Sequence, residues 1–549
     1  MKSTTYSQKK NESRNETEVS FNFSWKEAAD NTDFHEKFTK DVFEPYVVTR
    51  RWYGGKVSTI KNTEVIECIK FKSDEHHYLG FHIEVNYEES FFQNYFIVVG
   101  FLLKDELIEK ESVISEGEFS EGQGFFVDAL YFEDFRKLWF ELVVGTRMSE
   151  DSNLKFYSAL DVSKEAYESS RFIGAEQSNT SIIYNDMYVM KFFRRLFIGV
   201  NPDYEIAHFL TEKQKFSGVP SFKGGVNMQH FKDGITLALM QQLIPNKGDA
   251  WEYFNGLIFQ AYQNLERKKI NISKLPSVHL FQHVGMQKLP LEFIDFVGLE
   301  FFTKVKQLAE RTAELHIALG SNYEDTHFTS TNFNGDYAVW LKNRLIYQVQ
   351  SRLDAVENNI EKLQGEAHDL AEEFLLKKKA IRNFFLDFDW TTLKGERIRI
   401  HGDYHLGQVL VTDEDFVIID FEGEPESTIR DRKIKQPPLK DLAGLFRSYH
   451  YALFASILNN RGNLSYQTEH LFEAGEKLFT YIVGLTLSTY FEKIYRYGKL
   501  NLGYSKEQEF LLKYHMTEKA VYELGYELNS RPDWAIIPLK GISSIMKQL

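Results

Sequence analysis

The chain of 549 residues is acidic, with a formal net charge of −14, and 43% of its residues are apolar and 15% aromatic. It is long and apolar enough to bury the cores of two or three domains, and this composition excludes a disordered protein. The negative charge argues against nucleic acid or an anionic membrane as a partner. Cys68 is the single cysteine, which excludes an intrachain disulfide framework and indicates a reducing, cytoplasmic location.

The N-terminal region starts with a polar segment. Residues 1–20 lack the apolar stretch of a secretory signal, and we expect them to form a disordered tail. Residues 21–150 favour strands, because 81–85 and 95–103 alternate or run apolar between acidic turns. The run 95–103 is too short to cross a bilayer and is interpreted as a buried strand. We therefore predict a small α+β subdomain over residues 21–150.

The next segment, residues 151–245, is predicted to contain a β-hairpin and a helix. Two apolar runs, 181–184 and 187–193, flank the turn-forming Asn185-Asp186. The pair Asn201-Pro202 then starts a helix, with asparagine as the N-cap and proline at the first helical position.

A lysine and a glutamate in this segment indicate nucleotide binding. Lys191 lies on the second strand of the hairpin, and Glu205 lies on the helix. They suit the ion pair that positions a phosphate-binding lysine in the small lobe of kinase-like folds.

Two further stretches of this segment are predicted to contact a nucleotide. The loop before the hairpin lacks the glycines of a phosphate-binding loop, so backbone N–H groups and hydroxyls would replace them. The apolar strand 237–244 stops at a turn between a β-rich and a helical half, which is the position of a hinge and of adenine contacts. The residues predicted for these two roles are Ser178, Asn179, Thr180 and Ser181, and Gln242, Leu243 and Ile244.

Residues 246–549 are predicted to be mainly helical. Apolar residues recur at helical spacing in two stripes, over 305–319 and over 345–363. The second stripe is interpreted as one arm of a helical hairpin. The two stripes are separated by a polar connection, residues 322–336.

The segment 397–425 carries most of the predicted function. It reads RIRIHGDYHLGQVLVTDEDFVIIDFEGEP, with short apolar runs on either side of Glu414. Folding a hairpin about Glu414 brings Gln408 and Asp420 side by side, with Asp403 on the loop just before. A carboxylate and an amide oxygen can hold Mg²⁺ against phosphate oxygens, while Asp403 faces an incoming hydroxyl.

This spacing follows the H-x-D-x-x-x-x-N and D-F-G logic of protein kinases, with Gln408 in place of the asparagine. Two alternatives remain. The acidic residues could form a solvated surface turn, or His401 and His405 could belong to a zinc hydrolase. Phosphoryl transfer accounts for more of the residues in this segment than either alternative does. Asp403 is the predicted base, and His401 is predicted to brace the loop.

A helix is predicted from Leu439 to Tyr451. Its Asp441 is expected to cap the catalytic loop. Arg447, Tyr449 and His450 are polar groups in an otherwise apolar helix, and they are either half-exposed or in contact with substrate.

Taken together, these motifs resemble the bacterial maltokinases, including those fused to trehalose synthase. The resemblance runs from about residue 46 to the C-terminus. The stretches that carry it are RRWYGGK (50–56), EQSNTS (176–181), NPDYE (201–205), QQLIPNKGDAW (241–251), RTAELH (311–316), HGDYHLGQ (401–408), DFEGEP (420–425) and RPDWAIIPLKGI (531–542).

The resemblance implies an α+β, bilobal, aminoglycoside phosphotransferase-like fold. It would have an N-terminal cap subdomain (21–150), a β-rich small lobe (151–245) and a helical large lobe (246–549). It also implies ATP- and Mg²⁺-dependent phosphorylation of maltose at the anomeric hydroxyl, feeding α-glucan synthesis from trehalose, with trehalose synthase as a candidate partner. The predicted sugar contacts are His405, Glu422, Glu424, Arg447 and Tyr449. The alternatives are another acceptor such as glucosamine, or a nucleotide-binding regulator without turnover.

Overall fold

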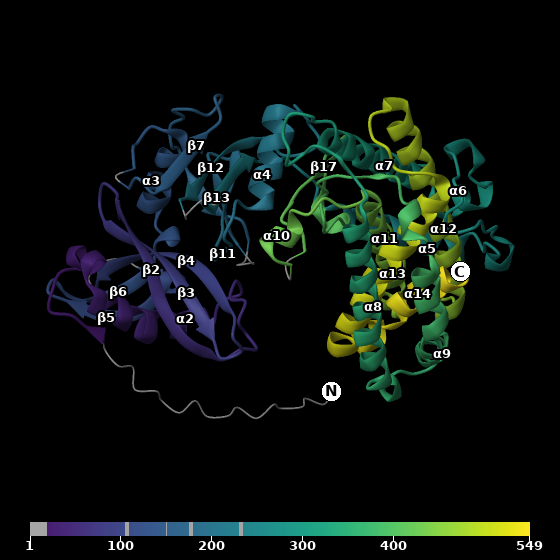
Figure 1. The fold of residues 1–549 in the computed structure, drawn as a ribbon, viewed down its shortest axis with the longest axis horizontal. Coiled ribbons are helices and arrows are strands. Elements are labelled where there is room, and N and C mark those ends of the chain that lie inside the picture. The colour runs from purple at the N-terminus through teal and green to yellow at the C-terminus, as the bar shows by residue number, and fades with distance from the viewer. Residues whose placement is uncertain are drawn as a thin grey trace. The chain divides into compact units, whose positions relative to one another are not determined.

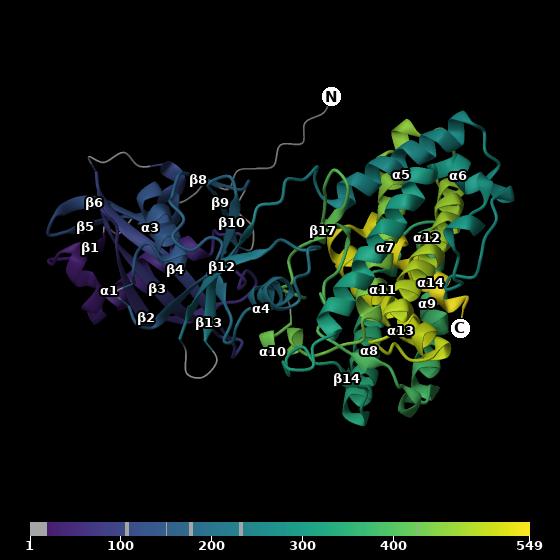
Figure 2. The same ribbon diagram turned by 90° about the horizontal axis from the view of Figure 1, so that it is seen from above.

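The computed structural model describes residues 19–104, 109–149, 151–174, 179–229, 234–424 and 427–548. The chain divides into two compact units. Unit 1 comprises residues 1–204 and 222–243, and unit 2 comprises residues 205–221 and 244–549. Unit 1, drawn in purple to blue, is rich in strands, whereas unit 2, drawn in teal to yellow, consists mainly of helices (Figures 1 and 2).

A seven-stranded sheet forms the first half of unit 1. Six strands follow the order β1-β5-β6-β4-β3-β2, and β11 pairs with β4. The pairing of β1 with β5 is parallel and that of β3 with β4 is antiparallel. The strands are β1 (Val19–Ser20), β2 (Ile60–Lys72), β3 (His77–Tyr87), β4 (Phe92–Leu103), β5 (Val113–Phe119), β6 (Gly122–Asp128) and β11 (Arg195–Leu196).

Aromatic packing fills the core beneath this sheet. The short helices α1 (Thr32–Lys37) and α2 (Glu44–Val47) lie in the same segment, and Phe38 stacks on Phe81 with ring centroids 4.5 Å apart. Val19 is buried in this core and pairs with Gly117. The predicted tail is therefore wrong for Val19 and Ser20, because burial of the valine extends the sheet; residues 1–18 lie outside the described residues.

A six-stranded sheet forms the second half of unit 1, in the order β7-β12-β13-β10-β9-β8. The predicted hairpin is confirmed as β9 and β10, and its turn residues Asn185 and Asp186 both have positive φ, as a type I′ turn requires. The strands are β7 (Leu154–Ser158), β8 (Ser170–Phe172), β9 (Thr180–Tyr184), β10 (Tyr188–Phe192), β12 (Phe222–Met228) and β13 (Ile235–Gln242).

Two buried side chains connect the sheets of unit 1. Trp139 of α3 (Glu133–Val144) lies 5.5 Å from Phe71 of β2 and 5.5 Å from Phe192 of β10, measured between ring centroids. Arg194 donates to the Thr180 hydroxyl at 3.0 Å and to the Asp128 carboxylate at 2.6 Å. Since Thr180 and Asp128 belong to different sheets, Arg194 ties the two sheets together.

Unit 2 packs its helices around α11, which contacts α5, α12, α13 and α14. The predicted stripes lie on α7 and α8, although α8 ends at Glu357, before the last members of the second stripe. The helices are α5 (Ala250–Arg267), α6 (Leu291–Val297), α7 (Leu299–Gly320), α8 (Gly335–Glu357), α9 (Glu366–Asp387), α10 (Ile429–Arg432), α11 (Leu439–Asn459), α12 (Thr468–Tyr497), α13 (Ser505–Ser530) and α14 (Ile536–Met546).

Two short antiparallel pairs complete unit 2. β14 (Thr331–Asn332) pairs with β15 (Glu396–Arg397) just before the HGD motif, and β16 (Val409–Val411) pairs with β17 (Phe416–Ile418) as the predicted hairpin. In the part of the chain that the structure describes, every helix is too short or too polar to cross a bilayer.

The buried pair of Asp128 and Arg194 generates the first prediction. Both side chains are at most 4% exposed, so Asp128→Ala leaves a desolvated guanidinium without its carboxylate. We expect unit 1 to lose about 3–5 kcal/mol of stability, measured by urea denaturation. The control is Asp30→Ala, which removes the exposed pair with Lys70 and should cost roughly 0–1 kcal/mol. Equal losses in the two variants would contradict the bridging role of Arg194.

Candidate active site

The loop from His401 to Gln408 is held by one buried carboxylate of α11. Asp441 accepts the backbone N–H of His401 at 2.8 Å through Oδ2 and that of Gly402 at 3.0 Å through Oδ1. The His316 ring of α7 lies 3.1 Å from the same Oδ2. Burial raises the pKa of Asp441, but these hydrogen bonds and the nearby imidazoles outweigh it and keep the pKa below its usual range. The predicted capping role of Asp441 is confirmed.

The loop also approaches the backbone of α11 closely. A Cβ on Gly444 would lie 2.5 Å from the carbonyl oxygen of Tyr404, so only glycine fits there. The Tyr404 hydroxyl lies 2.9 Å from the Thr312 hydroxyl of α7. The loop is therefore fixed by contacts with two helices.

His401 braces the loop, as predicted. Its side chain is buried, and its Nε2 lies 2.9 Å from the carbonyl oxygen of Ile419. His405 Nδ1 accepts the N–H of Gly407 at 3.1 Å and so caps the turn before Gln408. Among the described residues, no group of three side chains with the spacing of metal ligands includes either histidine, which weighs against the zinc alternative.

Asp403 faces Lys519, a lysine that no sequence motif singles out. Lys519 of α13 lies 3.0 Å from Asp403 Oδ1. Burial raises the pKa of Asp403, but the Lys519 ammonium and the imidazoles of His405 and His401 more than offset it, so the pKa lies below its usual range. Asp403 is therefore ionised at neutral pH and can accept a proton.

Gln408 and Asp420 meet at the open end of the hairpin. Gln408 Nε2 donates to Asp420 Oδ2 at 2.9 Å, and Asp420 has a positive φ of 67°. The hairpin register explains this contact, because the N–H of Ile419 donates to the carbonyl of Gln408 at 3.0 Å. Side-chain oxygens of this kind suit a hard cation such as Mg²⁺.

A cavity of about 400 Å³ adjoins the loop. It is formed by the loop together with side chains of α8, α11 and α13 and of the segment before α10. The lining residues are Arg344, Gln348, Gly402, Asp403, Tyr404, Glu424, Ser427, Lys440, Gly444, His515, Glu518, Lys519 and Tyr522.

The ionised side chains that line this cavity form pairs. Lys519 pairs with Asp403, Lys440 with Glu424 at 3.3 Å, and Arg344 with Glu518 at 2.6 Å. Burial raises the pKa of Glu424, but the positive charges of Lys440 and Arg344 lower it by more, so the pKa lies below its usual range. The three positive and three negative groups leave the lining with no net charge.

The structure brings only part of the predicted sugar contacts to this cavity. Glu424 lines it, whereas His405 and Glu422 lie outside the lining. The predicted sugar contacts of Arg447 and Tyr449 are wrong, because both side chains are buried inside unit 2. Arg447 pairs with Glu523 at 2.7 Å and Tyr449 packs on Phe254, since α11 is surrounded by other helices and has no exposed face for them.

The helix α13 supplies lining residues that the sequence analysis missed. His515, Glu518, Lys519 and Tyr522 follow one another at the spacing of a single helical face. A polar stripe on a largely buried helix could have indicated a binding surface in the sequence. Only the fold shows that this stripe faces Asp403.

In unit 1, Lys191 lies on β10 between Ser181 of β9 and Leu239 of β13. Its ammonium lies 2.8 Å from Asp203, a buried residue of α4 (Pro202–His208). The predicted pair with Glu205 is therefore wrong. Glu205 instead pairs with Arg399 at 2.8 Å and Lys433 at 3.4 Å, within unit 2. Asp203 follows the N-cap Asn201 so closely that the start of the helix carries the carboxylate toward the strand.

The other predicted nucleotide contacts are partly described. Thr180 and Ser181 lie on β9, and Asn179 immediately precedes them, whereas Ser178 lies outside the described residues. Gln242 ends β13, and the N–H of Leu243 donates to the carbonyl of Met187 at 2.8 Å. Ile244 is the first residue after the second segment of unit 1.

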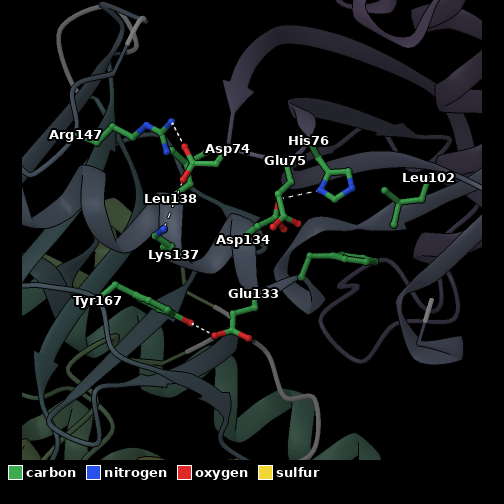
Figure 3. Close-up of a pocket in the computed structure, with 11 residues that line it drawn as sticks. Asp74, Glu75, His76, Leu102, Glu133, Asp134, Lys137, Leu138, Arg147 and Tyr167 are labelled. Carbon is green, nitrogen blue, oxygen red and sulfur yellow. Dashed lines mark hydrogen bonds and ion pairs between the residues drawn. The ribbon is translucent and has the colours of Figure 1, made fainter. Parts of the chain in front are cut away.

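Unit 1 also contains a cavity of about 550 Å³, between α3 and the turn that joins β2 to β3 (Figure 3). Two of its acidic groups lie in ion pairs, Asp74 with Arg147 at 3.0 Å and Asp134 with His76 at 3.0 Å. Glu133 accepts from the Tyr167 hydroxyl at 3.1 Å. These contacts hold α3 against the β2–β3 turn, and we assign the cavity no catalytic role.

Part of unit 2 is similar in sequence to known phosphotransferases. Residues 258–424 match the profile described as the phosphotransferase enzyme family. A glucosamine kinase of Streptacidiphilus jiangxiensis is 23% identical over 283 residues, which are 51% of this chain and 53% of that protein. The chain thus spans about half the length of this curated relative.

Solved structures extend the likeness to the whole fold. A glucosamine kinase in complex with glucosamine, ADP and inorganic phosphate has a TM-score of 0.61 and 14% identity, covering 92% of this chain and 98% of that one. Crystal form A of glucosamine kinase gives the same TM-score, with 96% and 100% coverage. The predicted fold class is confirmed: the chain has the α+β, bilobal fold of aminoglycoside phosphotransferase-like kinases.

The contacts of Asp441 generate the second prediction. Asp441→Ala removes the acceptor of the buried His401 N–H and the part-buried Gly402 N–H, and an unpaired buried group costs about 1–3 kcal/mol. We expect a lower melting temperature and faster hydrogen exchange of the His401 and Gly402 amides. Asp413→Ala, at the exposed tip of the hairpin, is the control and should leave both measurements unchanged. Unchanged exchange in Asp441→Ala would refute the capping role.

Proposed function

We propose that this protein transfers the γ-phosphoryl group of ATP to a hydroxyl of a sugar, and that the acceptor is maltose, giving maltose 1-phosphate. In this proposal the product supplies α-glucan synthesis from trehalose. The observation that carries it is the ionised Asp403, which lines a cavity large enough for a small ligand and lies on the same loop as Gln408.

The chemistry follows from the residues of each unit. Asp403 orients the acceptor hydroxyl and takes its proton as the new O–P bond forms and the bond from the γ-phosphorus to the leaving oxygen of ADP breaks. Such transfers pass through a loose transition state, so positioning and charge neutralisation supply most of the rate. In unit 1, Lys191, held by Asp203, would contact the α- and β-phosphates.

Gln408 and Asp420 are the residues that would hold Mg²⁺. The Gln408 amide nitrogen lies 2.9 Å from Asp420 Oδ2, so the two side chains share one end of the hairpin. The Gln408 amide oxygen and the Asp420 carboxylate are hard oxygen ligands, which suit this cation. When bound, Mg²⁺ would neutralise charge on the phosphate oxygens. Asp441 contributes indirectly, because it fixes the backbone from which Asp403 projects.

Charge in the cavity favours a neutral acceptor. Each carboxylate among the described lining residues already lies in an ion pair, so a cationic amine would find no unpaired carboxylate there. This supports maltose. Glucosamine is the second candidate, because the relative at 23% identity and the solved structures at a TM-score of 0.61 are glucosamine kinases.

The third prediction tests the reaction and the base together. A panel of sugars is incubated with ATP and Mg²⁺, ADP release is followed, and the product is identified by NMR. We expect phosphorylation of maltose at the anomeric carbon. Asp403→Asn should lower kcat by about 10²–10⁴-fold, because the amide cannot accept the proton. Asp413→Asn, at the exposed tip of the hairpin that follows the loop, is the matched control.

Distinct outcomes would overturn distinct parts of this proposal. Phosphorylation of glucosamine but not maltose would replace the acceptor. Nucleotide binding without any sugar-dependent ADP release would favour the regulatory alternative, and wild-type turnover by Asp403→Asn would exclude Asp403 as the base.

The fourth prediction concerns pH. Lys519 lowers the pKa of Asp403, so Lys519→Met should raise it and leave less of the carboxylate ionised under acidic conditions. We therefore expect the acid limb of kcat/KM to move to higher pH, while Lys519→Arg restores the wild-type profile. Lys506→Met, at an exposed position in the first turn of α13, should leave the profile unchanged. A profile unaltered in Lys519→Met would show that the ion pair does not set the ionisation of Asp403.

A further inference from the structure

Two buried hydrogen-bond acceptors line the cavity beside Asp403. Within the described residues, neither His515 Nε2 nor Gln348 Oε1 has a hydrogen-bond partner, and both atoms are buried. Both residues line the cavity, and the His515 side chain is 2% exposed. A buried acceptor without a donor costs free energy, so two of them at one cavity indicate that a ligand supplies the donors.

The contacts of His515 fix its protonation. Its Nδ1 lies 3.2 Å from Glu518 Oε2. Burial raises the pKa of Glu518, but the contacts with His515, Arg344 and Lys440 lower it well below its usual range, so Glu518 is an ionised acceptor. Nδ1 must then carry the proton. Burial also lowers the pKa of His515, so the ring is neutral and Nε2 is an acceptor.

Rigid supports hold the two acceptors in place. Gln348 lies on α8 and His515 on α13, and these helices are joined by the pair of Arg344 with Glu518 at 2.6 Å. The Tyr514 hydroxyl adds a second link, because it donates to the carbonyl of Leu341 at 2.6 Å. The acceptors are therefore preorganised by the fold and need little rearrangement to bind a ligand.

We propose that His515 and Gln348 recognise two hydroxyl groups of the acceptor and thereby select an uncharged sugar. This inference rests on the proposed function and deepens it. Hydroxyl groups can donate to both acceptors without adding charge to a lining whose ionised groups are already paired. An ammonium group could donate as well, but it would add an uncompensated charge to a partly dehydrated cavity.

The experiment measures binding and turnover in matched variants. Gln348→Met and His515→Phe keep the approximate bulk of each side chain and remove the acceptor. We expect each to raise KM for maltose about tenfold, as loss of one hydrogen bond predicts, with kcat and the KM for ATP little changed. Gln350→Met on α8 and His279→Phe, both at exposed positions, are the controls.

Calorimetry with maltose and with glucosamine provides a readout that does not require turnover. Wild-type protein should bind maltose more tightly than glucosamine at pH 7, and either variant should weaken maltose binding about tenfold. Monodeoxy analogues sharpen the test. The analogue that lacks the recognised hydroxyl should bind wild-type protein weakly and lose little further affinity in the matching variant.

The two proposals can fail separately. If no sugar were phosphorylated but maltose bound and the variants weakened it, the proposed function would be overturned and the recognition pair would stand. If maltose were phosphorylated and Gln348→Met bound it with unchanged affinity, the recognition pair would be overturned. If His515→Phe fails to fold, the Gln348→Met variant alone tests the recognition pair. Within the described part of the chain the Gln348 side chain pairs with no buried carboxylate, so we expect this variant to fold.

Discussion

The candidate site depends on one buried carboxylate that organises a loop through its backbone. Asp441 accepts two consecutive N–H groups, at His401 and Gly402, and the next residue along the chain is Asp403. Because the contact is made to the main chain, it fixes the direction in which the Asp403 side chain leaves the loop. Hydrogen bonds to an ionised group are stronger than neutral ones, and burial protects them from water. The loop is thus rigid before any substrate arrives.

The charged side chains that line the cavity beside this loop pair with one another and, in the described part of the chain, do not bind the backbone. The three cations and three carboxylates compensate one another, so they shape and stiffen the walls without attracting an ion. Paired charges in a poorly hydrated site are costly to separate. In our proposal, selection among ligands then falls to two neutral acceptor atoms, His515 Nε2 and Gln348 Oε1, which have no hydrogen-bond partner within the described residues.

The residues of the candidate site in unit 2 lie partly inside and partly outside the segment that matches the family profile. The match to the phosphotransferase enzyme family covers residues 258–424, which include the loop and the hairpin with Asp403, Gln408 and Asp420. It ends before α11 and α13, which supply Asp441, His515 and Lys519. The unit 2 residues proposed for phosphoryl transfer therefore lie within the matched segment, as do Arg344 and Glu424 of the cavity wall, whereas Lys440, Glu518 and Lys519 lie beyond it.

Local patterns in the sequence were sufficient for the loop, the hairpins and the helix starts, because spacing and turn chemistry act over a few residues. The contact of Gln408 with Asp420 could be predicted from the sequence alone, and so could the capping role of Asp441. The partner of Lys191 could not, because a shift of two residues along a helix start exchanges Asp203 for Glu205. Nor could the burial of Arg447 and Tyr449 or the face of α13 that meets Asp403. Those depend on which helices surround α11, and contacts between segments more than a hundred residues apart are decided only when the chain packs.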